Sequence, residues 1–309
     1  MTATNGRHRP SSPPTLPPMK RSDWLLLVAL SIPWGGSFLF FRILAPALPP
    51  LTLAFARVAI AALALATTQL PGVWRARQHW RAFLALGLFN NALPFALFAY
   101  GEHTIPAGIA AICNALTPIF TLLALRAARR TPPLTITHWL GIALGFAGVT
   151  LLAGPASLSA ASLLGTAACI AAALSYGLAA LFMPPLRSLP PLTTATAQLL
   201  ASTVLLAAPA LLDHPWTLPP LSLHAWAALL ALALVSTAFA YLLFFKIVAS
   251  AGPANAMLVT YLVPISAVAL SATFLGEAIT PPAIAGALLI ALGLLLLDGR
   301  LTRRVPATP

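Results

Sequence analysis

Residues Trp80–Ile119 read WRAFLALGLFNNALPFALFAYGEHTIPAGIAAICNALTPI, and the pattern returns without a gap at Trp226–Ile265 as WAALLALALVSTAFAYLLFFKIVASAGPANAMLVTYLVPI. The informative matches are a tryptophan pair, a proline pair and a doubled polar pair: Trp80 with Trp226, Pro118 with Pro264, and Asn90 and Asn91 with Ser236 and Thr237. Such a repeat at a fixed offset indicates an internal duplication. Each copy is predicted to form two apolar spans joined by a short turn.

The composition indicates an integral membrane protein. Of the 309 residues, 60% are hydrophobic and only 7% are charged, whereas about 25% are charged in a typical soluble domain. The net charge of +12 would suggest nucleic acid in a soluble domain, but the basic residues are scattered over loops. Membrane proteins collect Lys and Arg in cytoplasmic loops. We therefore expect a lipid bilayer as partner and no nucleic acid.

Apolar runs of about 18 to 23 residues recur along the chain, the length that crosses a hydrocarbon core of about 30 Å. They predict ten transmembrane helices, at 24-42, 52-70, 82-101, 105-125, 136-153, 160-183, 192-212, 225-246, 254-275 and 281-298. Residues 1-21 are rich in Pro, Ser and Thr and predict a disordered cytoplasmic tail, and 300-309 predict a second tail. Basic residues gather in alternate loops, which places both termini in the cytoplasm.

The duplication also predicts a symmetry. The third and fourth expected helices repeat as the eighth and ninth, and because this offset of five spans is odd, the second copy enters the membrane from the opposite face. We expect an all-α membrane protein with two inverted five-helix repeats, 22-153 and 154-299. Substrate sites in such folds lie near the midplane between the copies, so a solvent-reachable pocket is expected there.

Several short motifs follow one another in a characteristic order: WGGSF at Trp34–Phe38, FAR at Phe55–Arg57, NNALPF at Asn90–Phe95, NALTPIFT at Asn114–Thr121, YLVP at Tyr261–Pro264 and FLGE at Phe274–Glu277. Their order and duplication resemble the EamA-type repeat of the drug/metabolite transporter superfamily, over about Trp24 to Leu297. The resemblance implies a carrier of small metabolites in a bacterial inner membrane, with a central cavity lined mainly by helices one, three, four, six, eight and nine. The chain departs from the pattern at Arg130 and Thr131, which stand in the first copy where the second has Gly276 and Glu277.

Arg57 is the clearest candidate for a functional side chain. It lies about one and a half turns inside the second expected helix, and Gln198 occupies the matching place in the second copy. A charged residue at a helix centre costs about 2.5 kcal/mol or more on insertion scales, so it needs a partner or water. Two interpretations remain: an attractor for anionic groups of a substrate, or a side chain that snorkels or binds neighbouring carbonyls.

Other polar and aromatic residues complete the predicted substrate-binding set. Polar side chains lie at equivalent depths in the two halves and could line the cavity or simply join helices: Asn90 and Asn91 with Ser236 and Thr237, and Asn114 with Thr260. Adjacent asparagines point about 100° apart on a helix, so at most one can face the cavity squarely. Four aromatic residues could form a cage for amphipathic or cationic substrates, or pack as ordinary core: Trp34, Tyr176, Tyr241 and Tyr261.

Prolines and glycines indicate where helices could bend and where they could pack closely against one another. Pro118 and Pro264 match between the copies, and each removes a backbone donor, so we predict that they are hinges, with static kinks as the alternative. Small residues spaced for close helix contact predict helix packing or a homodimer interface: Gly141, Gly145, Gly148, Gly286 and Gly293.

Acids and histidines are too peripheral to predict chemistry inside the membrane. The six histidines fall in tails, loops or span edges, and the five acids lie near span ends: Asp23, Glu102, Asp213, Glu277 and Asp298. No catalytic residue, metal site or cofactor is therefore predicted, and Glu102 with His103 is only a minor candidate for ion coupling. Cys113 and Cys169 lie inside apolar spans and are expected to be packing residues.

The sequence therefore predicts a secondary transporter of small metabolites or amphipathic compounds, with export favoured, that works by alternating access between its halves. Two other classes stay open. An intramembrane enzyme acting on lipids would need converging acids, histidines or a nucleophile within the bilayer. A non-transporting scaffold held by its glycine faces would leave no water-filled cavity.

Overall fold

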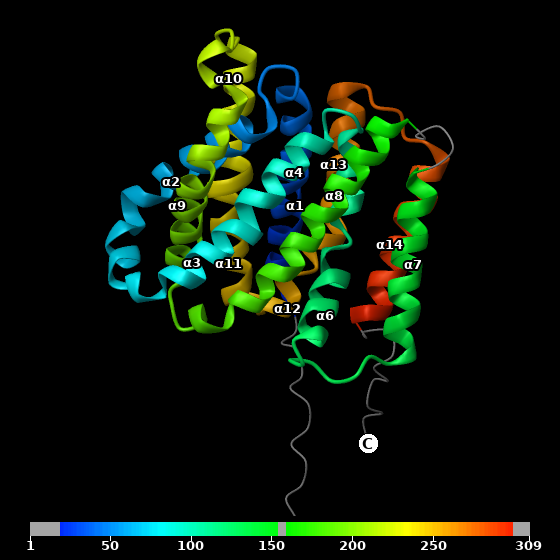
Figure 1. The fold of residues 1–309 in the computed structure, drawn as a ribbon. Coiled ribbons are helices and arrows are strands. Elements are labelled where there is room, and N and C mark those ends of the chain that lie inside the picture. Colours follow the sequence, from blue (N-terminus) through cyan, green and yellow to red (C-terminus); the bar gives the residue numbers. More distant parts are fainter. Residues whose placement is uncertain (1–18, 154–158, 299–309) are drawn as a thin grey trace, which may run out of the picture.

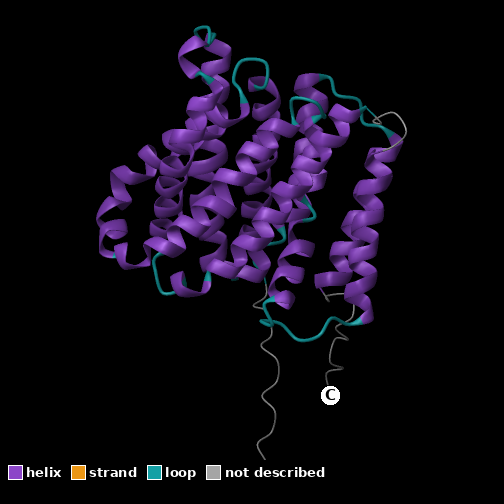
Figure 2. Cartoon of the chain, viewed as in Figure 1, coloured by secondary structure: helices purple, strands orange, loops and turns teal. Residues whose placement is uncertain are grey.

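The computed structural model describes residues 19–153 and 159–298. Within these ranges the chain consists of helices, turns and loops, as Figure 2 shows. Nearly all of the first predicted tail, the whole of the second, and the start of the predicted second half lie outside the described residues. The predicted all-α class is thus confirmed for the part of the chain that forms the bundle.

The first half contains seven α-helices and two short helical segments: α1 (Arg21–Leu44), α2 (Pro50–Arg75), η1 (Arg77–His79), α3 (Trp80–Gly87), η2 (Leu88–Ala92), α4 (Leu93–Gly101), α5 (Ala107–Asn114), α6 (Thr117–Ala127) and α7 (Ile136–Ala153). Proline opens α2 at Pro50, where its missing N–H has no helical partner to lose and its fixed φ suits the first turn. In the second half, α9 and α14 also begin with proline, at Pro191 and Pro281.

The second half contains α8 (Ala160–Ala179), η4 (Ala180–Phe182), η5 (Pro184–Leu186), α9 (Pro191–Ala210), η6 (Leu211–Asp213), η7 (Pro215–Thr217), α10 (Leu223–Leu230), η8 (Ala231–Phe239), α11 (Ala240–Ala251), α12 (Pro253–Ala256), α13 (Val259–Leu275) and α14 (Pro281–Asp298). The segments η2 and η8 are π-helices, and the other η segments are 3₁₀ turns. Each of the ten stretches predicted to be helical therefore contains helical structure.

Seven helical segments of the described chain are long and apolar enough to cross a membrane: Arg21–Leu44, Pro50–Arg75, Arg77–Gly101, Ala107–Ala127, Ala160–Phe182, Pro191–Asp213 and Leu223–Ala251. Three shorter apolar helices occupy the remaining expected positions: Ile136–Leu151, Val259–Leu275 and Pro281–Leu297. The chain is a multi-span membrane protein, and length and composition by themselves support seven of the ten expected spans.

The two copies of the repeat run in opposite directions through the bundle. In Figure 1 the chain rises from α3 to α4 and descends from α10 to α11. The contacts between helices show the same relation between the halves. Helix α1 packs against α13 and α11 of the second half, and its counterpart α8 packs against α6 and α4 of the first. In two further pairs a helix packs against its own counterpart, α2 against α9 and α7 against α14. These contacts of one half thus have equivalents in the other.

The start of α1 and the end of α14 lie at the same end of the bundle, the lower end in Figure 1. We call the opposite end, where α1, α4 and α13 finish, the far end. The large apolar core between these ends is built from α1, α2, α4, α8, α9 and the α10–α11 segment, with Phe41, Phe98 and Leu232 among its fully buried side chains.

Both polar pairs of the duplication lie in π-helical turns. Asn90 and Asn91 belong to η2, and Ser236 and Thr237 belong to η8. In a regular α-helix the ring of Pro94 would clash with the carbonyl of Asn90, and the wider turn before Pro94 relieves this conflict. In η8 the Thr237 hydroxyl donates to the carbonyl of Leu232, five residues earlier, at 2.9 Å. Single π turns of this kind are frequent at functional sites.

The fourth and ninth expected helices are not continuous, contrary to the prediction. Turns at residues 115–116 separate α5 from α6, and turns at residues 257–258 separate α12 from α13. Pro118 occupies the second position of α6, where no intrahelical donor is needed, whereas Pro264 lies inside α13. The two prolines match in sequence but are not equivalent in structure.

The glycine faces of α7 and α14 pack against each other within one chain. These helices lie side by side at the right of Figure 1. A Cβ atom added to Gly148 would lie 2.6 Å from the carbonyl oxygen of Gly286, and one added to Gly293 would lie 2.5 Å from that of Gly141. Intramolecular packing, one of the two predicted alternatives, is thus what these residues do here.

We expect Gly148→Leu to lower the free energy of unfolding by about 1–3 kcal/mol, because the added side chain overpacks a contact between two backbones. The measurement is the midpoint of thermal unfolding in detergent. The matched control is Thr150→Leu on the exposed side of the same helix, where little change is expected. Equal midpoints for both variants would contradict the proposed packing.

Candidate functional site

Arg57 of α2 lies buried at the seam between the halves, with 5% of its surface exposed. Its Nε donates a hydrogen bond to Thr237 Oγ1 of η8 at 2.9 Å, and its Nη2 donates to Ser37 Oγ of α1 at 3.3 Å. The guanidinium carbon lies 3.7 Å from the ring centroid of Phe95 and 5.0 Å from that of Phe41. The side chain therefore points into the protein and does not snorkel to a surface.

The surroundings of Arg57 are unusual for a buried charge. Among the described residues, no carboxylate forms a hydrogen bond or ion pair with it. A desolvated cation over an aromatic ring gains about 2 kcal/mol or more, so Phe95 offsets part of the penalty of burial. A guanidinium carries five N–H donors, and here two of its nitrogens have hydrogen-bond acceptors in the described chain. Arg57 thus retains capacity to bind an anionic oxygen.

A second polar cluster joins the two halves through amides. Asn90 Nδ2 donates to Gln198 Oε1 of α9 at 3.1 Å, and Gln198 Nε2 donates to the Tyr241 hydroxyl of α11 at 3.1 Å. The Tyr241 hydroxyl in turn donates to Asn91 Oδ1 at 3.2 Å. Both asparagines therefore enter one network, and Gln198 is a functional candidate that the sequence indicated only as the counterpart of Arg57.

Serine hydroxyls bind the backbone around η2. Ser175 Oγ of α8 donates to the carbonyl of Phe89 at 2.8 Å, and Ser202 Oγ of α9 donates to that of Gly87 at 2.9 Å. These bonds satisfy carbonyl groups beside the π turn and fix its position against the second half. The π turn is therefore held in place by side chains of the second half.

The four predicted aromatic residues do not converge as one cage. The rings of Trp34 and Phe244 lie 5.4 Å apart, those of Phe244 and Phe245 5.3 Å, and those of Phe245 and Tyr241 6.0 Å, so Trp34 and Tyr241 lie in one aromatic row. Tyr176 and Tyr241 lie close enough to Arg57 to interact with its charge. Tyr261 packs against a separate apolar cluster beside α7 and α14, in line with the core alternative, and its part in substrate binding stays a prediction.

The three remaining candidates are Ser236, Asn114 and Thr260. The hydroxyl of Ser236 is buried and has no hydrogen-bond partner among the described residues. At the break after α5, Thr117 Oγ1 donates to the Asn114 carbonyl at 2.8 Å, and Thr260 Oγ1 donates to the Met257 carbonyl at 2.8 Å beside the other break. Asn114 and Thr260 therefore take part in local bonding where the helices are interrupted.

The polar seam is sealed from solvent in this conformation. The exposed fractions are 5% for Arg57, 4% for Gln198, 2% for Thr237 and 0% for Asn91. The predicted solvent-reachable pocket is thus replaced at these residues by polar side chains that contact one another. A solute could reach Arg57 only after the helices around it move apart.

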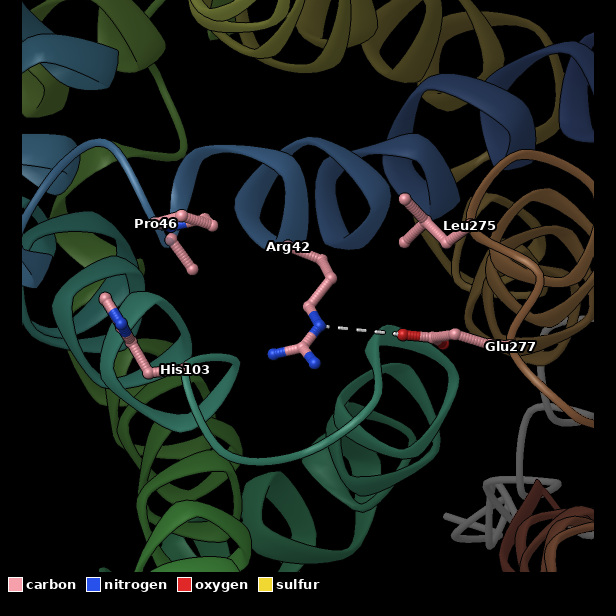
Figure 3. Close-up of a pocket in the computed structure, with 6 residues that line it drawn as sticks. Arg42, Pro46, His103, Leu275 and Glu277 are labelled. Carbon is pink, nitrogen blue, oxygen red and sulfur yellow. Dashed lines mark ion pairs between the residues drawn. The ribbon is translucent and has the colours of Figure 1, made fainter.

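A pocket of about 430 Å³ does open at the far end, lined by Arg42, Ala45, Pro46, His103, Leu275 and Glu277. Figure 3 shows the Arg42 guanidinium directed toward Glu277, with His103 across the pocket. Arg42 Nε lies 3.8 Å from Glu277 Oε1, and Arg42 Nη1 donates to the backbone oxygen of Glu102 at 2.6 Å. Arg42 therefore links the ends of α1, α4 and α13.

Glu277 caps a helix of the other half. Its carboxylate accepts from the backbone N–H groups of Ala107 and Gly108, at 3.1 and 3.4 Å, at the start of α5. A carboxylate at a helix N-terminus satisfies free donors and complements the helix dipole. The first half lacks the equivalent acid, and there Arg130 Nη1 donates to the carbonyl of Leu181 at 2.6 Å.

Glu102 follows α4 directly and is fully buried, and neither carboxylate oxygen has a hydrogen-bond partner among the described residues. Burial raises the pKa of Glu102 well above its usual range, the negative charge of Glu277 raises it further, and Arg42 and Arg57 oppose the rise. Burial and the positive charge of Arg42 lower the pKa of His103. Residues 19–153 and 159–298 contain no cluster of three or more His, Cys, Asp or Glu residues suited to a metal ion.

Comparisons with known proteins agree with this architecture. The model of the EamA-like transporter family matches twice, at residues 22–154 and 163–297. The uncharacterized transporter YvbV of Bacillus subtilis is 27% identical over 285 residues, which are 89% of this chain and 90% of that protein. The uncharacterized inner membrane transporter YedA of Escherichia coli K12 is 35% identical over 141 residues, 43% of this chain and 44% of its own length.

A solved crystal structure shares the fold, with a TM-score of 0.64 and 19% identity over 93% of this chain and all of the other. The two family matches together span almost all of the described residues. The chain is a member of the EamA-like transporter family, a membrane protein with two copies of the family's repeat.

Proposed function

We propose that this protein is a secondary transporter that moves small metabolites bearing an anionic group across the inner membrane. The observation that carries the proposal is Arg57, a buried guanidinium held by one hydroxyl from each half, Ser37 and Thr237, and paired with no carboxylate of the described chain. A buried cation that keeps free donors is suited to an anionic partner that comes and goes.

The transporter crosses the membrane ten times in this proposal, with 22-153 and 154-299 as inverted halves and both termini in the cytoplasm. The opposite directions of α3–α4 and α10–α11 support the inversion. The shared location of the start of α1 and the end of α14 supports an even number of spans. The basic residues of the alternate loops favour the cytoplasmic side for that end.

The substrate is an anion with an apolar or aromatic body. Arg57 supplies the charge, and two buried atoms of the π-helical turns, Asn91 Nδ2 and Ser236 Oγ, have no hydrogen-bond partner in the described chain. Buried polar groups are nearly always paired, so these atoms suit a site that receives partners from a solute. The row from Trp34 to Tyr241 offers ring faces to its apolar part.

Alternating access follows from the sealed seam. Because Arg57 is 5% exposed, a substrate has to enter and leave through separate openings or rearrangements. Inverted halves provide two equivalent ways to open, one toward each side of the membrane. The interrupted helices α5–α6 and α12–α13 supply positions at which each half can bend without breaking a continuous hydrogen-bond ladder.

The test is flux of a panel of labelled carboxylates, phosphate esters and amphipathic cations in proteoliposomes, with gradients imposed in each direction. We expect at least one anionic solute to cross faster than in empty liposomes, and efflux from the cytoplasmic side to be the faster direction. Recovery of every solute unchanged is also expected, since an enzyme would release a product. No flux of any anionic solute under either gradient would contradict the proposal.

Hinge action is proposed for Pro118 and Pro264. Replacing both with alanine restores two donors and favours straighter helices. If the prolines together bias opening by about 1 kcal/mol, the double variant transports about fivefold more slowly. Pro264→Ala alone is expected to have the larger share, because Pro264 interrupts α13 internally whereas Pro118 occupies a helix start. Transport at the wild-type rate, matching the loop control Pro132→Ala, would contradict the hinge.

A homodimer remains a prediction. Because Gly141, Gly148, Gly286 and Gly293 pack within one chain, a dimer would use other surfaces. Light scattering of the detergent-solubilised protein measures its mass directly.

A further inference from the structure

Glu102 is the one buried carboxylate of the described chain that caps no helix and pairs with no donor. By contrast, Asp23 accepts from the Lys20 amide, Asp213 from the Thr52 amide, and Glu277 from the Ala107 amide. An ionised carboxylate without partners in an apolar site is strongly disfavoured, and such a group takes up a proton instead. The surroundings of Glu102 therefore favour its neutral form.

The titratable groups that interact electrostatically with Glu102 are Arg42 of α1, Arg57 of α2, Cys169 of α8 and Glu277 beyond α13, and His103 is next to it in the chain. Arg42 lies near enough to ionise the acid, but its Nη1 binds the backbone oxygen and its Nε faces Glu277. Glu277 opposes ionisation by its own negative charge. The closed far end thus holds the neutral form.

The far-end pocket offers a route by which that proton can leave. Glu102 does not line the pocket, but three lining residues adjoin it: Arg42 through its hydrogen bond, His103 through the chain and Glu277 through its charge. If α1 and α13 separate, the 3.8 Å pair between Arg42 and Glu277 breaks and water reaches the carboxyl group. Arg42 then becomes available to the newly formed carboxylate.

We propose that Glu102 is a proton switch for the far end, holding a proton while this end is closed and releasing it when this end opens. The inference rests on the proposed function and names a group that would regulate it. On opening, the carboxyl O–H bond breaks, the proton passes to water in the pocket, and Arg42 exchanges Glu277 for Glu102 as partner. On closing, the carboxylate regains a proton before it is buried.

The direction of the pH effect follows from this cycle. Because the closed conformation favours the protonated acid, it loses stability relative to the open one as pH rises through the raised pKa of Glu102. Low pH therefore favours a closed far end, and high pH favours an open one. This dependence needs no substrate, so it can be measured before one is identified.

The first experiment is infrared spectroscopy of the purified full chain in lipid at neutral pH. The chain has only five acidic side chains, so its carboxyl bands can be assigned by substitution. We expect a neutral carboxylic C=O band that Glu102→Gln removes and that Asp213→Asn leaves intact. A spectrum without that band, or one that Glu102→Gln does not change, would overturn the proton site.

The second experiment measures the opening of the far end. Spin labels at Pro46→Cys and Ile279→Cys report its width, since both positions are exposed while Cys113 and Cys169 are fully buried. As pH rises, we expect the longer label distance to gain population in the native background and in Glu102→Asp, but not in Glu102→Gln. An unchanged pH response in Glu102→Gln would overturn the switch, even if flux measurements uphold transport. Loss of flux with this pH response intact would count against transport and not against the proton site.

Discussion

Arg57→Gln is expected to lower kcat/KM for transport of an anionic solute by about 10- to 150-fold, the equivalent of losing about 1.5–3 kcal/mol of charge-assisted hydrogen bonding. Glutamine is the residue that occupies the equivalent place in the second half, at Gln198, so the chain already accommodates it at this depth. The variant removes the charge and the planar fork while keeping a polar side chain. The measurement is initial flux in proteoliposomes at matched protein content.

Two controls separate binding from folding. Arg57→Lys keeps the charge without the fork and is expected to give an intermediate rate, because an ammonium binds a carboxylate at a single point. Thermal unfolding shows whether each variant is folded, since loss of the bond to Thr237 would also loosen α2 against η8. Full transport of every anionic solute by a folded Arg57→Gln variant would leave Arg57 with a structural role only.

Phe95→Ala is expected to destabilise the protein by about 3–5 kcal/mol, the range for removing a buried phenylalanine. Phe95 is 5% exposed and its ring lies 3.7 Å from the Arg57 guanidinium, so the substitution opens a cavity and also removes the aromatic face beneath the charge. The measurement is the shift of the unfolding midpoint in detergent.

Leucine variants isolate the cation–π contribution. Phe95→Leu keeps an apolar body but loses the ring, and Phe98→Leu makes the same change at a buried phenylalanine that packs against Phe38. We expect Phe95→Leu to be more destabilising by about 2 kcal/mol, the value of a desolvated cation–π contact. Equal effects at the two positions would show that the ring over Arg57 contributes only volume.

Helix positions could be predicted because a membrane span leaves a long apolar run that hydropathy detects. The same signal is insensitive to a single extra residue in a turn, so the π segments Leu88–Ala92 and Ala231–Phe239 could not be predicted. Their only trace was the polar pair in each copy. The break after Asn114 also escaped prediction, because Ala115 and Leu116 suit a helix as well as a turn.

Whether the role of a candidate residue could be predicted depends on whether its contacts are close or distant in the sequence. Arg57 and Thr237 could be found from type and depth, since a charge inside a span is costly wherever it lies. The role of Glu277 at the start of α5 could not, because it depends on a contact between halves separated by 170 residues in the chain. For the same reason the sequence could not decide between cage and core for Tyr261, which packs against the apolar cluster beside α7 and α14.

We expect the sealed polar seam to open alternately to the two sides of the membrane. The most direct measurement is the reaction of Asn90→Cys with a membrane-impermeant thiol reagent in right-side-out and inverted vesicles, in a background with Cys113→Ala and Cys169→Ala. Leu63→Cys on an exposed apolar face serves as the control. We predict that Asn90→Cys reacts from both sides and Leu63→Cys from neither. Reaction of Asn90→Cys from one side only, or from none, would contradict it.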